Sequence, residues 1–133
     1  NNLRLDSPIG GRDSAHCTAL GKAILAFMPK PVQENHVNEY GLSMRTPNTI
    51  TDPAEFFREL SIIKEQGYAM DREEVALGIE CVAAPIFDNM MNPIAAISIS
   101  MPNNPGNMGR MKEYKKQIVI ASKKISNKLG AKI

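Results

Sequence analysis

The chain has 133 residues, of which 43% are hydrophobic and 23% charged, and it carries a formal net charge of +2. This composition indicates one soluble domain with a single core, and it excludes collagen-like and disordered classes. No apolar run approaches the roughly 18 to 20 residues that cross a bilayer, and no signal-peptide region is present, so we expect a cytoplasmic protein without a membrane partner. Two cysteines, Cys17 and Cys81, are too few for a secreted disulfide framework, which favours reduced thiols.

The first part of the chain predicts a strand, a turn and a helix. Leu3–Ile9 has strand character, Gly10 begins a turn, and Ser14–Met28 has an apolar face at helical spacing before Pro29 stops it. The N-terminus of this helix offers free backbone N–H groups to an anion. Glycine inside a helix costs roughly 1 kcal/mol relative to alanine, so Gly21 indicates close approach of another group, such as a tight helix-to-sheet contact.

Two more helices are expected before the chain returns to strands. The first is a short helix at Val32–Glu39. The second begins at Pro53 with Asp52 as its N-cap and Glu55 in its first turn, and it continues to Gly67.

A short apolar strand is predicted at Tyr68–Asp71, with Arg72–Val75 as its solvated continuation. Carboxylates are plentiful in the chain, but Asp71 stands out because it ends an apolar strand. It is therefore the carboxylate that we expect to have a defined position.

The segments Ile79–Asp88 and Ala95–Ser100 predict a β-hairpin, because both are apolar, too short for helices and separated by Asn and Pro residues. A four-residue loop from Asp88 to Pro93 pairs Phe87 with Ile94, Ala83 with Ser98 and Cys81 with Ser100. Alternation then places Cys81, Ala83, Ser98 and Ser100 on one face and Ile97 with Ile99 on the other. The polar face is either a pocket wall or a half-exposed surface. Pro85 indicates a strand edge or a bulge.

The last segment predicts a basic amphipathic helix. Residues 105–133 contain eight of the sixteen basic residues and one acid, Glu113. An inward stripe at helical spacing comprises Met111, Tyr114, Ile118, Ser122, Ile125 and Leu129. The lysines outside this stripe form either a phosphate-contacting surface or a solvated face, and the scarcity of Arg and interleaved aromatic residues favours the solvated face.

Catalytic groups are few, and we expect no catalytic residue, cofactor or metal. His16 and Cys17 are neighbours, but adjacent helical residues point about 100 degrees apart, which disfavours a nucleophile–base pair. Cys17, Cys81 and Asp71 with His16 or His36 have ligand chemistry suited to zinc, although their spacing matches no known pattern. No phosphate-binding, dinucleotide, zinc-protease or serine-hydrolase motif occurs.

A longer pattern joins five segments across nearly the whole chain: His16–Ala23, Thr46–Thr51, Gly67–Asp71 with Glu74, Gly78–Asp88 and Ala96–Ser100. In this order and at these separations they resemble the C-terminal effector-binding domain of IclR-type transcriptional regulators. The resemblance implies an α/β, GAF-like (profilin-like) domain with a curved antiparallel sheet flanked by helices. It also implies a function as a repressor that binds operator DNA as a homodimer or homotetramer.

The resemblance further implies that residues 1–133 are an effector-binding domain fragment. The chain begins at Asn1 without a methionine, which favours a piece of a longer protein. The family's N-terminal winged helix-turn-helix domain, through which operator DNA is bound, is not present in this chain, and the first helix and strands of the effector domain are also expected to be missing.

Carried over by position, the family's ligand pocket implies six contact residues. The ligand is a small carboxylate metabolite such as a 2-oxo or 2-hydroxy acid, met by the backbone N–H groups of Ala19 and Leu20. The remaining polar contacts fall on Asp71, Cys81, Ser98 and Ser100. Leu5 and Ile79 are expected as apolar walls, and Asp13-Ser14-Ala15 departs from the Pro-Leu pair common at the pocket mouth.

Two classes of function follow. The first is a regulatory sensor whose ligand shifts conformational populations and thereby changes DNA binding. The second is a GAF-like thiol module that acts in redox chemistry or metal sensing through Cys81. The second class is disfavoured because Cys17 lies on another element and no resolving pair is evident.

Overall fold

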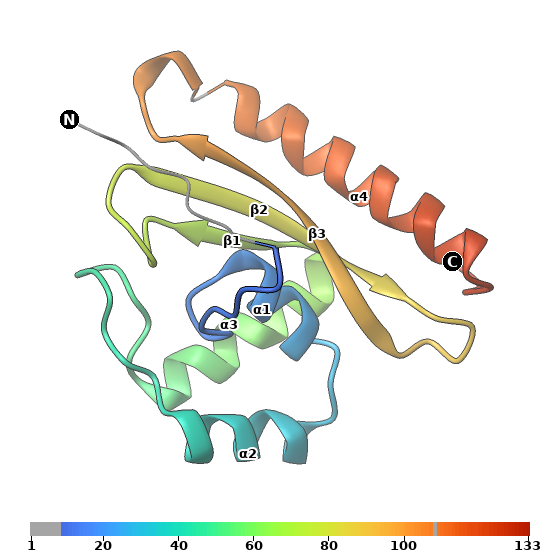
Figure 1. The fold of residues 1–133 in the computed structure, drawn as a ribbon, viewed down its shortest axis with the longest axis horizontal. Coiled ribbons are helices and arrows are strands. Elements are labelled where there is room, and N and C mark those ends of the chain that lie inside the picture. Colours follow the sequence, from blue (N-terminus) through green and yellow to red (C-terminus); the bar gives the residue numbers. More distant parts are fainter. Residues whose placement is uncertain (1–8, 108) are drawn as a thin grey trace.

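The computed structural model describes residues 9–107 and 109–133, and within them the chain forms one antiparallel sheet of order β1-β2-β3. The strands are β1 (Ala69–Arg72), β2 (Ile79–Phe87) and β3 (Pro93–Pro102). Figure 1 shows β3 crossing the sheet with a pronounced twist. The strand predicted at Leu3–Ile9 and the apolar wall at Leu5 lie outside the described residues, except for Ile9, which belongs to a turn.

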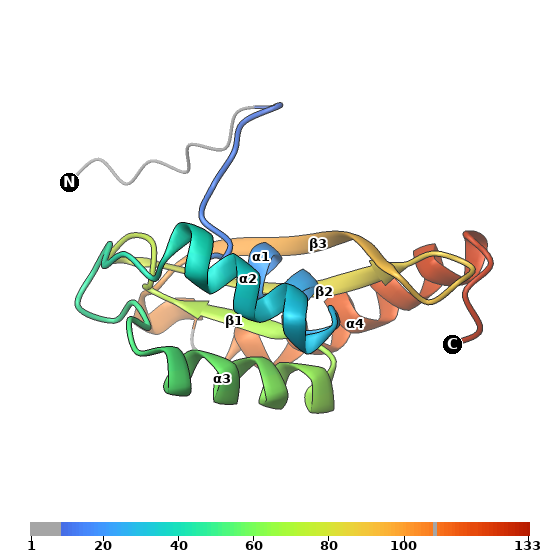
Figure 2. The same ribbon diagram turned by 90° about the horizontal axis from the view of Figure 1, so that it is seen from below.

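Helices cover both faces of this sheet (Figures 1 and 2). One face carries α4, which contacts β2 and β3, and the other carries α1, which contacts all three strands and α3. The helices are α1 (Ala19–Leu25), α2 (Lys30–Tyr40), α3 (Pro53–Gln66) and α4 (Arg110–Lys128), with a short 3-10 turn, η1, at Pro105–Asn107. No described helix has the length and apolar character that crossing a bilayer requires.

The hairpin register is confirmed at the polar positions and wrong at the turn. Cys81 pairs with Ser100 and Ala83 with Ser98, as predicted, but Phe87 pairs with Pro93 instead of Ile94. An irregularity between Ile86 and Phe87 shifts the register there, because a bulge inserts an extra residue into one strand. At Pro85, β2 is paired with β3 but extends beyond the end of β1, which suits a residue without an N–H.

The two helix starts differ in how well the sequence predicts them. At α3, the Asp52 side chain accepts a hydrogen bond from the Glu55 N–H at 3.0 Å, as expected. The predicted helix at 14–28 is shorter, because Thr18 caps α1 and residues 15–17 form a turn. A Cβ at Gly21 would lie 2.3 Å from the Ala15 Cα, so the close approach is to this turn and not to the sheet.

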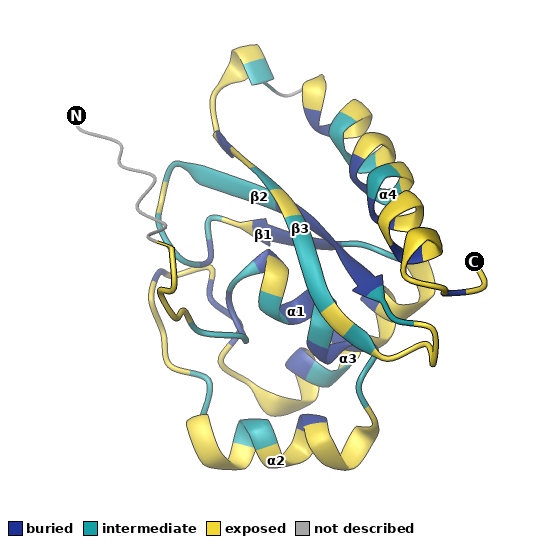
Figure 3. Ribbon diagram, turned by 45° about the vertical axis from the view of Figure 1, so that its right-hand side comes forward, coloured by how far each residue is buried: buried dark blue, intermediate teal, exposed yellow. Residues whose placement is uncertain are grey.

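Figure 3 shows buried residues concentrated on β2 and on the inward side of α4. On the α4 face, Met70, Val82 and Met101 pack with Met111 and Ile118. On the other face, the core is built from alanines and larger residues of α1, α3 and the strands, including Ala19, Ala23, Phe56, Leu60, Ile63 and Ala83.

The inward stripe of α4 is partly different from the prediction. Ile125 and Leu129 are 37% and 46% exposed, whereas Ser126 is fully buried. The Ser126 hydroxyl accepts a hydrogen bond from the Phe87 N–H at 2.9 Å. Phe87 follows the register shift in β2, where its half-buried backbone N–H needs an acceptor, and the serine supplies it.

Candidate functional site

A row of polar side chains crosses the sheet on the face that α1 covers. Asp71 on β1 pairs with Cys81 on β2, and Cys81 pairs with Ser100 on β3. Ser98 lies two residues from Ser100 and therefore shares its face. The structure thus brings together the four side chains that the sequence predicted as polar ligand contacts.

The polar row is buried at one end and open at the other. Asp71 is 3% exposed, Cys81 is half-buried, and both serines are exposed. The Cys81 Sγ and the Ser100 Oγ are 3.0 Å apart and form a hydrogen bond. The serine hydroxyls are thus the accessible end of the row, and the Asp71 carboxyl group is its buried end. Ile79, expected as an apolar wall, is half-buried at the start of β2.

The start of α1 lies against the same face. Thr18 accepts a hydrogen bond from the Gly21 N–H at 3.1 Å and donates one to the Ser14 carbonyl at 2.9 Å. Ala19 is 2% exposed and Leu20 is 40% exposed. Their N–H groups belong to the first turn, where a helix leaves its amides without intrahelical acceptors. Their role as ligand donors stays a prediction.

Lys22 is the residue of this region whose role the sequence reasoning missed. Its side chain is fully buried, and its Nζ donates to both carboxylate oxygens of Glu74 at 2.9 Å. Glu59 on α3 lies 3.7 Å from the same ammonium. The prediction that Arg72–Val75 is solvated is therefore wrong at Glu74, which is 4% exposed. A signal was present, because Lys22 lies on the buried stripe formed by Ala19, Ala23 and Ala26.

The loop before α3 forms hydrogen bonds to the segment that follows β1. The Thr46 hydroxyl donates to the Glu73 carbonyl and the Thr49 hydroxyl donates to the Glu74 carbonyl, each at 2.6 Å. Both threonines are buried. Two of the segments that carried the sequence resemblance, at Thr46–Thr51 and around Glu74, are thus in direct contact.

Burial raises the pKa of Asp71 to about 6. The Glu74 N–H, which donates to Asp71 Oδ1 at 2.7 Å, and the Lys22 ammonium act in the opposite direction, while the Glu74 charge raises the pKa further. The carboxyl group can therefore change its charge near physiological pH. A ligand carboxylate beside ionised Asp71 would be repelled, so this titration bears directly on anion binding.

Neither thiol has the properties of a reactive cysteine. Burial raises the pKa of Cys17 to about 11, and burial also raises the pKa of Cys81, so the nucleophilic thiolate is disfavoured at both positions. His16 Nε2 is 2.8 Å from the Ser43 carbonyl. In residues 9–107 and 109–133, no group of three or more His, Cys, Asp or Glu side chains could hold a metal ion. These observations give the thiol-module alternative no support.

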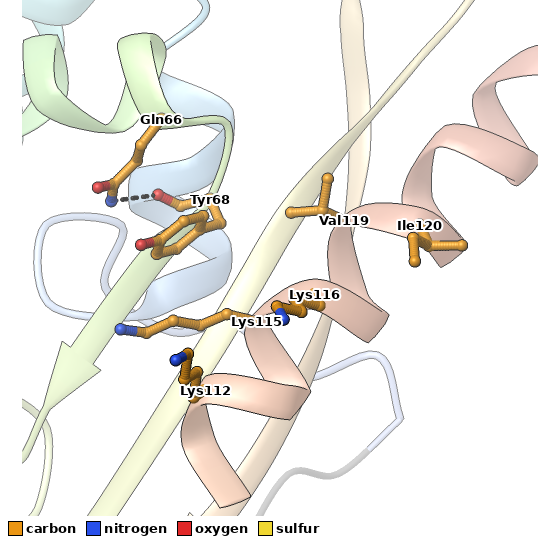
Figure 4. A pocket seen from close by; sticks show the side chains of 7 residues that line it. All are labelled: Gln66, Tyr68, Lys112, Lys115, Lys116, Val119 and Ile120. Atoms are coloured by element: carbon orange, nitrogen blue, oxygen red, sulfur yellow. Dashed lines mark hydrogen bonds between the residues drawn. The ribbon is translucent and has the colours of Figure 1, made fainter.

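A groove of about 570 Å³ lies away from the polar row, between α4 and the end of α3 (Figure 4). The Gln66 side chain donates to the Tyr68 carbonyl at 2.9 Å, and the Lys115 ammonium lies 5.6 Å from the Tyr68 ring centroid. The lining of this groove contains none of the predicted ligand residues. It comprises Gln66, Tyr68, Lys112, Lys115, Lys116, Val119 and Ile120.

Sequence comparisons identify relatives over nearly the whole chain. The family model "Bacterial transcriptional regulator IclR C-terminal" matches residues 1–127. The transcriptional repressor IclR of Escherichia coli K12 is 34% identical over 128 residues, which cover 96% of this chain and 47% of that protein. This chain spans about half the length of the curated relatives it matches.

Solved structures agree with this assignment. The Thermotoga maritima IclR structure has a TM-score of 0.90 and 38% identity, covering 98% of this chain and 53% of that chain. The inducer-binding domain of a PobR double mutant from Acinetobacter, in complex with 3-hydroxybenzoic acid, has a TM-score of 0.78 and 28% identity, covering 96% of this chain and 74% of that chain.

Fold and matches together define a GAF-like α/β domain with an open antiparallel sheet flanked by helices, as the sequence predicted. The chain belongs to the IclR family of bacterial transcriptional regulators and corresponds to the C-terminal domain of that family. The matched relatives are transcriptional regulators and not enzymes.

Proposed function

We propose that this chain is the effector-binding domain of an IclR-type repressor and that its ligand is a small carboxylate metabolite, such as a 2-oxo or 2-hydroxy acid. The observation that carries the proposal is the polar row in which Asp71, Cys81 and Ser100 face α1 across three paired strands. In the related PobR domain, 3-hydroxybenzoic acid is the bound molecule. That compound combines a carboxylate with a hydroxyl group, which is the chemistry proposed here.

The two ends of the row have different tasks in this proposal. The hydroxyls of Ser98 and Ser100 and the N–H groups of Ala19 and Leu20 donate to the ligand carboxylate. Asp71 meets a hydroxyl or hydrated carbonyl group at the opposite end, where its distance from the ligand carboxylate limits repulsion. Cys81 contributes a neutral thiol contact, consistent with its raised pKa.

The remaining parts of the function lie in the whole protein. An N-terminal winged helix-turn-helix domain binds operator DNA in the cytoplasm, and the protein acts as a homodimer or homotetramer. Effector binding favours one arrangement of these subunits and so changes operator affinity, with an effect limited by the difference in effector affinity between the two arrangements.

Calorimetry of the complete protein with a panel of 2-oxo and 2-hydroxy acids, starting from pyruvate and lactate, tests this function. We expect saturable binding of at least one acid. Because a hydrogen bond to a charged group contributes about 1.5–3 kcal/mol, Ser98→Ala and Ser100→Ala should each weaken binding about tenfold or more. Ser61→Ala, on the exposed side of α3, is the matched control and should leave binding unchanged.

The outcome that would contradict the function is the absence of binding by every acid in the panel while the protein is folded. Equal affinities for the wild type and both serine variants would leave a ligand site elsewhere, and the polar row would then lose its proposed role.

A further inference from the structure

The ion pair between Lys22 and Glu74 is buried, and burying charged groups has a large desolvation cost. The side chains are 0% and 5% exposed, and removing two charges from water is repaid only when the geometry is good and further hydrogen bonds are made. Both carboxylate oxygens of Glu74 accept from Lys22. Neither residue is among the six predicted ligand contacts, so this pair needs another explanation.

Glu74 makes two hydrogen bonds to residues at the end of β1, one through its side chain and one through its backbone N–H. Its Oε2 accepts a hydrogen bond from the Arg72 N–H at 3.0 Å, and its own N–H donates to Asp71 Oδ1 at 2.7 Å. A continuous path of contacts therefore runs from the Lys22 ammonium on α1, through Glu74, to the Asp71 carboxylate.

The segment that carries this path is held in an uncommon conformation. Glu73 has a φ of 58°, in the left-handed region that residues other than glycine seldom adopt. Its Oε1 accepts from the Gly78 N–H at 2.8 Å, while Thr46 and Thr49 hold the carbonyls of Glu73 and Glu74. Strained backbone persists where its surroundings fix it, and such positions concentrate at binding sites.

We propose that Lys22, acting through Glu74, is a positioning residue that holds Asp71 in one orientation in the pocket, so that an ion pair outside the ligand contacts controls effector affinity. The inference rests on the proposed function of the polar row. Because Lys22 is on α1, the same contact couples the helix that begins at the pocket to the carboxyl group at its deep end.

Several charged or titratable groups face Asp71 from the elements around it. They are Lys22 from α1, Cys17 and Arg45 from the connecting segments, Cys81 from β2 and Glu74 from its own loop. From α3, Glu59 lies 3.7 Å from the Lys22 ammonium. The positive charge of Lys22 lowers the pKa of Asp71, whereas the negative charge of Glu74 raises it. Removing each side-chain charge separately should therefore move the pKa of Asp71 in opposite directions.

Carbon-13 NMR titration of the Asp71 carboxyl group in the ligand-free complete protein gives the direct test. We expect Lys22→Met to raise the pKa of Asp71, Glu74→Gln to lower it, and the double variant to lie near the wild type. The Glu74 amide proton should follow the Asp71 titration in the wild type and lose this dependence in Lys22→Met. Lys112→Met, an exposed lysine on α4, is the control.

The binding experiment uses the same variants with the acid that binds the wild type most tightly in the pyruvate and lactate panel. Lys22→Met should weaken binding about tenfold, as expected for a contact chain that includes a charged hydrogen bond, and the pH profile of affinity should move with Asp71. If Lys22→Met does not fold, Glu74→Gln and the double variant provide the same comparison.

An Asp71 titration and an amide signal at position 74 in folded Glu74→Gln that both equal those of the wild type would overturn the inference and leave the ion pair a structural role only. Opposite shifts of the Asp71 pKa without binding of any acid to the wild type would support the coupling and contradict the proposed function. The two hypotheses therefore fail in distinguishable ways.

Discussion

The two faces of the sheet are stabilised by different kinds of interaction. Against α4, the strands present methionine and aliphatic side chains, with Met70, Val82 and Met101 packed on Ile118. Against α1, apolar packing surrounds buried charged groups, namely Lys22, Asp71 and Glu74. Apolar contacts are tolerant of rearrangement, whereas buried charges require particular partners. This difference agrees with the proposal that the ligand site lies on the α1 face, while the α4 face contributes mainly apolar packing to the fold.

Breaking the ion pair should have the largest effect on the α1 face. Lys22→Met leaves Glu74 buried without its cation, and losing one member of a buried pair costs about 3–5 kcal/mol. Urea unfolding measures the change. Replacing both residues by Met should recover most of the loss, because a well-packed apolar pair removes the desolvation cost. A double variant as unstable as Lys22→Met would show that packing, and not charge, matters here.

On the α4 face, the corresponding loss of stability should come from a cavity in the apolar core. Ile118 is 4% exposed, so Ile118→Ala should destabilise the protein by about 3 kcal/mol through lost burial and an unfilled cavity. Ile120, 55% exposed on the same helix, provides the control, and Ile120→Ala should cost less than about 0.5 kcal/mol. The loss at Ile118 should be equal at pH 5 and pH 7, since its core cluster consists of Met, Val, Ala, Ile and Tyr side chains, which do not titrate in this range.

The α1 face should instead depend on pH. The pKa of Asp71 is raised from 3.8 to about 6, so between these values the folded protein holds a proton that the unfolded chain has released. Stability should then fall as pH rises through this range, by up to about 2 kcal/mol, and level off above it. Asp71→Asn removes the titrating group. Urea midpoints from pH 4 to pH 7 should show a smaller slope for this variant than for the wild type.

The helix cap gives the smallest expected effect. Thr18→Ala removes the acceptor of the Gly21 N–H, and the loss of such a cap costs about 1 kcal/mol. Thr18→Ser, which keeps the oxygen, is the matched control. Thermal unfolding measures the change, and equal midpoints for both variants would mean that the cap contributes nothing at this position.

Local patterns predicted the polar row but not the contacts beneath it. Alternation of side chains along the strands was enough to pair Cys81 with Ser100, because a slip of one residue would move every side chain to the other face. The shift at Phe87 was missed, since a bulge has no reliable signal in one sequence. The contact of Lys22 with Glu74 spans 52 positions, and only the folded chain brings these residues together.

The opposite ends of the polar row also differ in how freely they can be altered. Ser98 and Ser100 are exposed and contribute little to the core, whereas Asp71 depends on a loop, a helix and a buried cation. Under the proposed function, substitutions on β3 should therefore change which acid is preferred without lowering the yield of folded protein. Engineering of a biosensor from this domain should vary the β3 positions first and keep the Asp71 end unchanged.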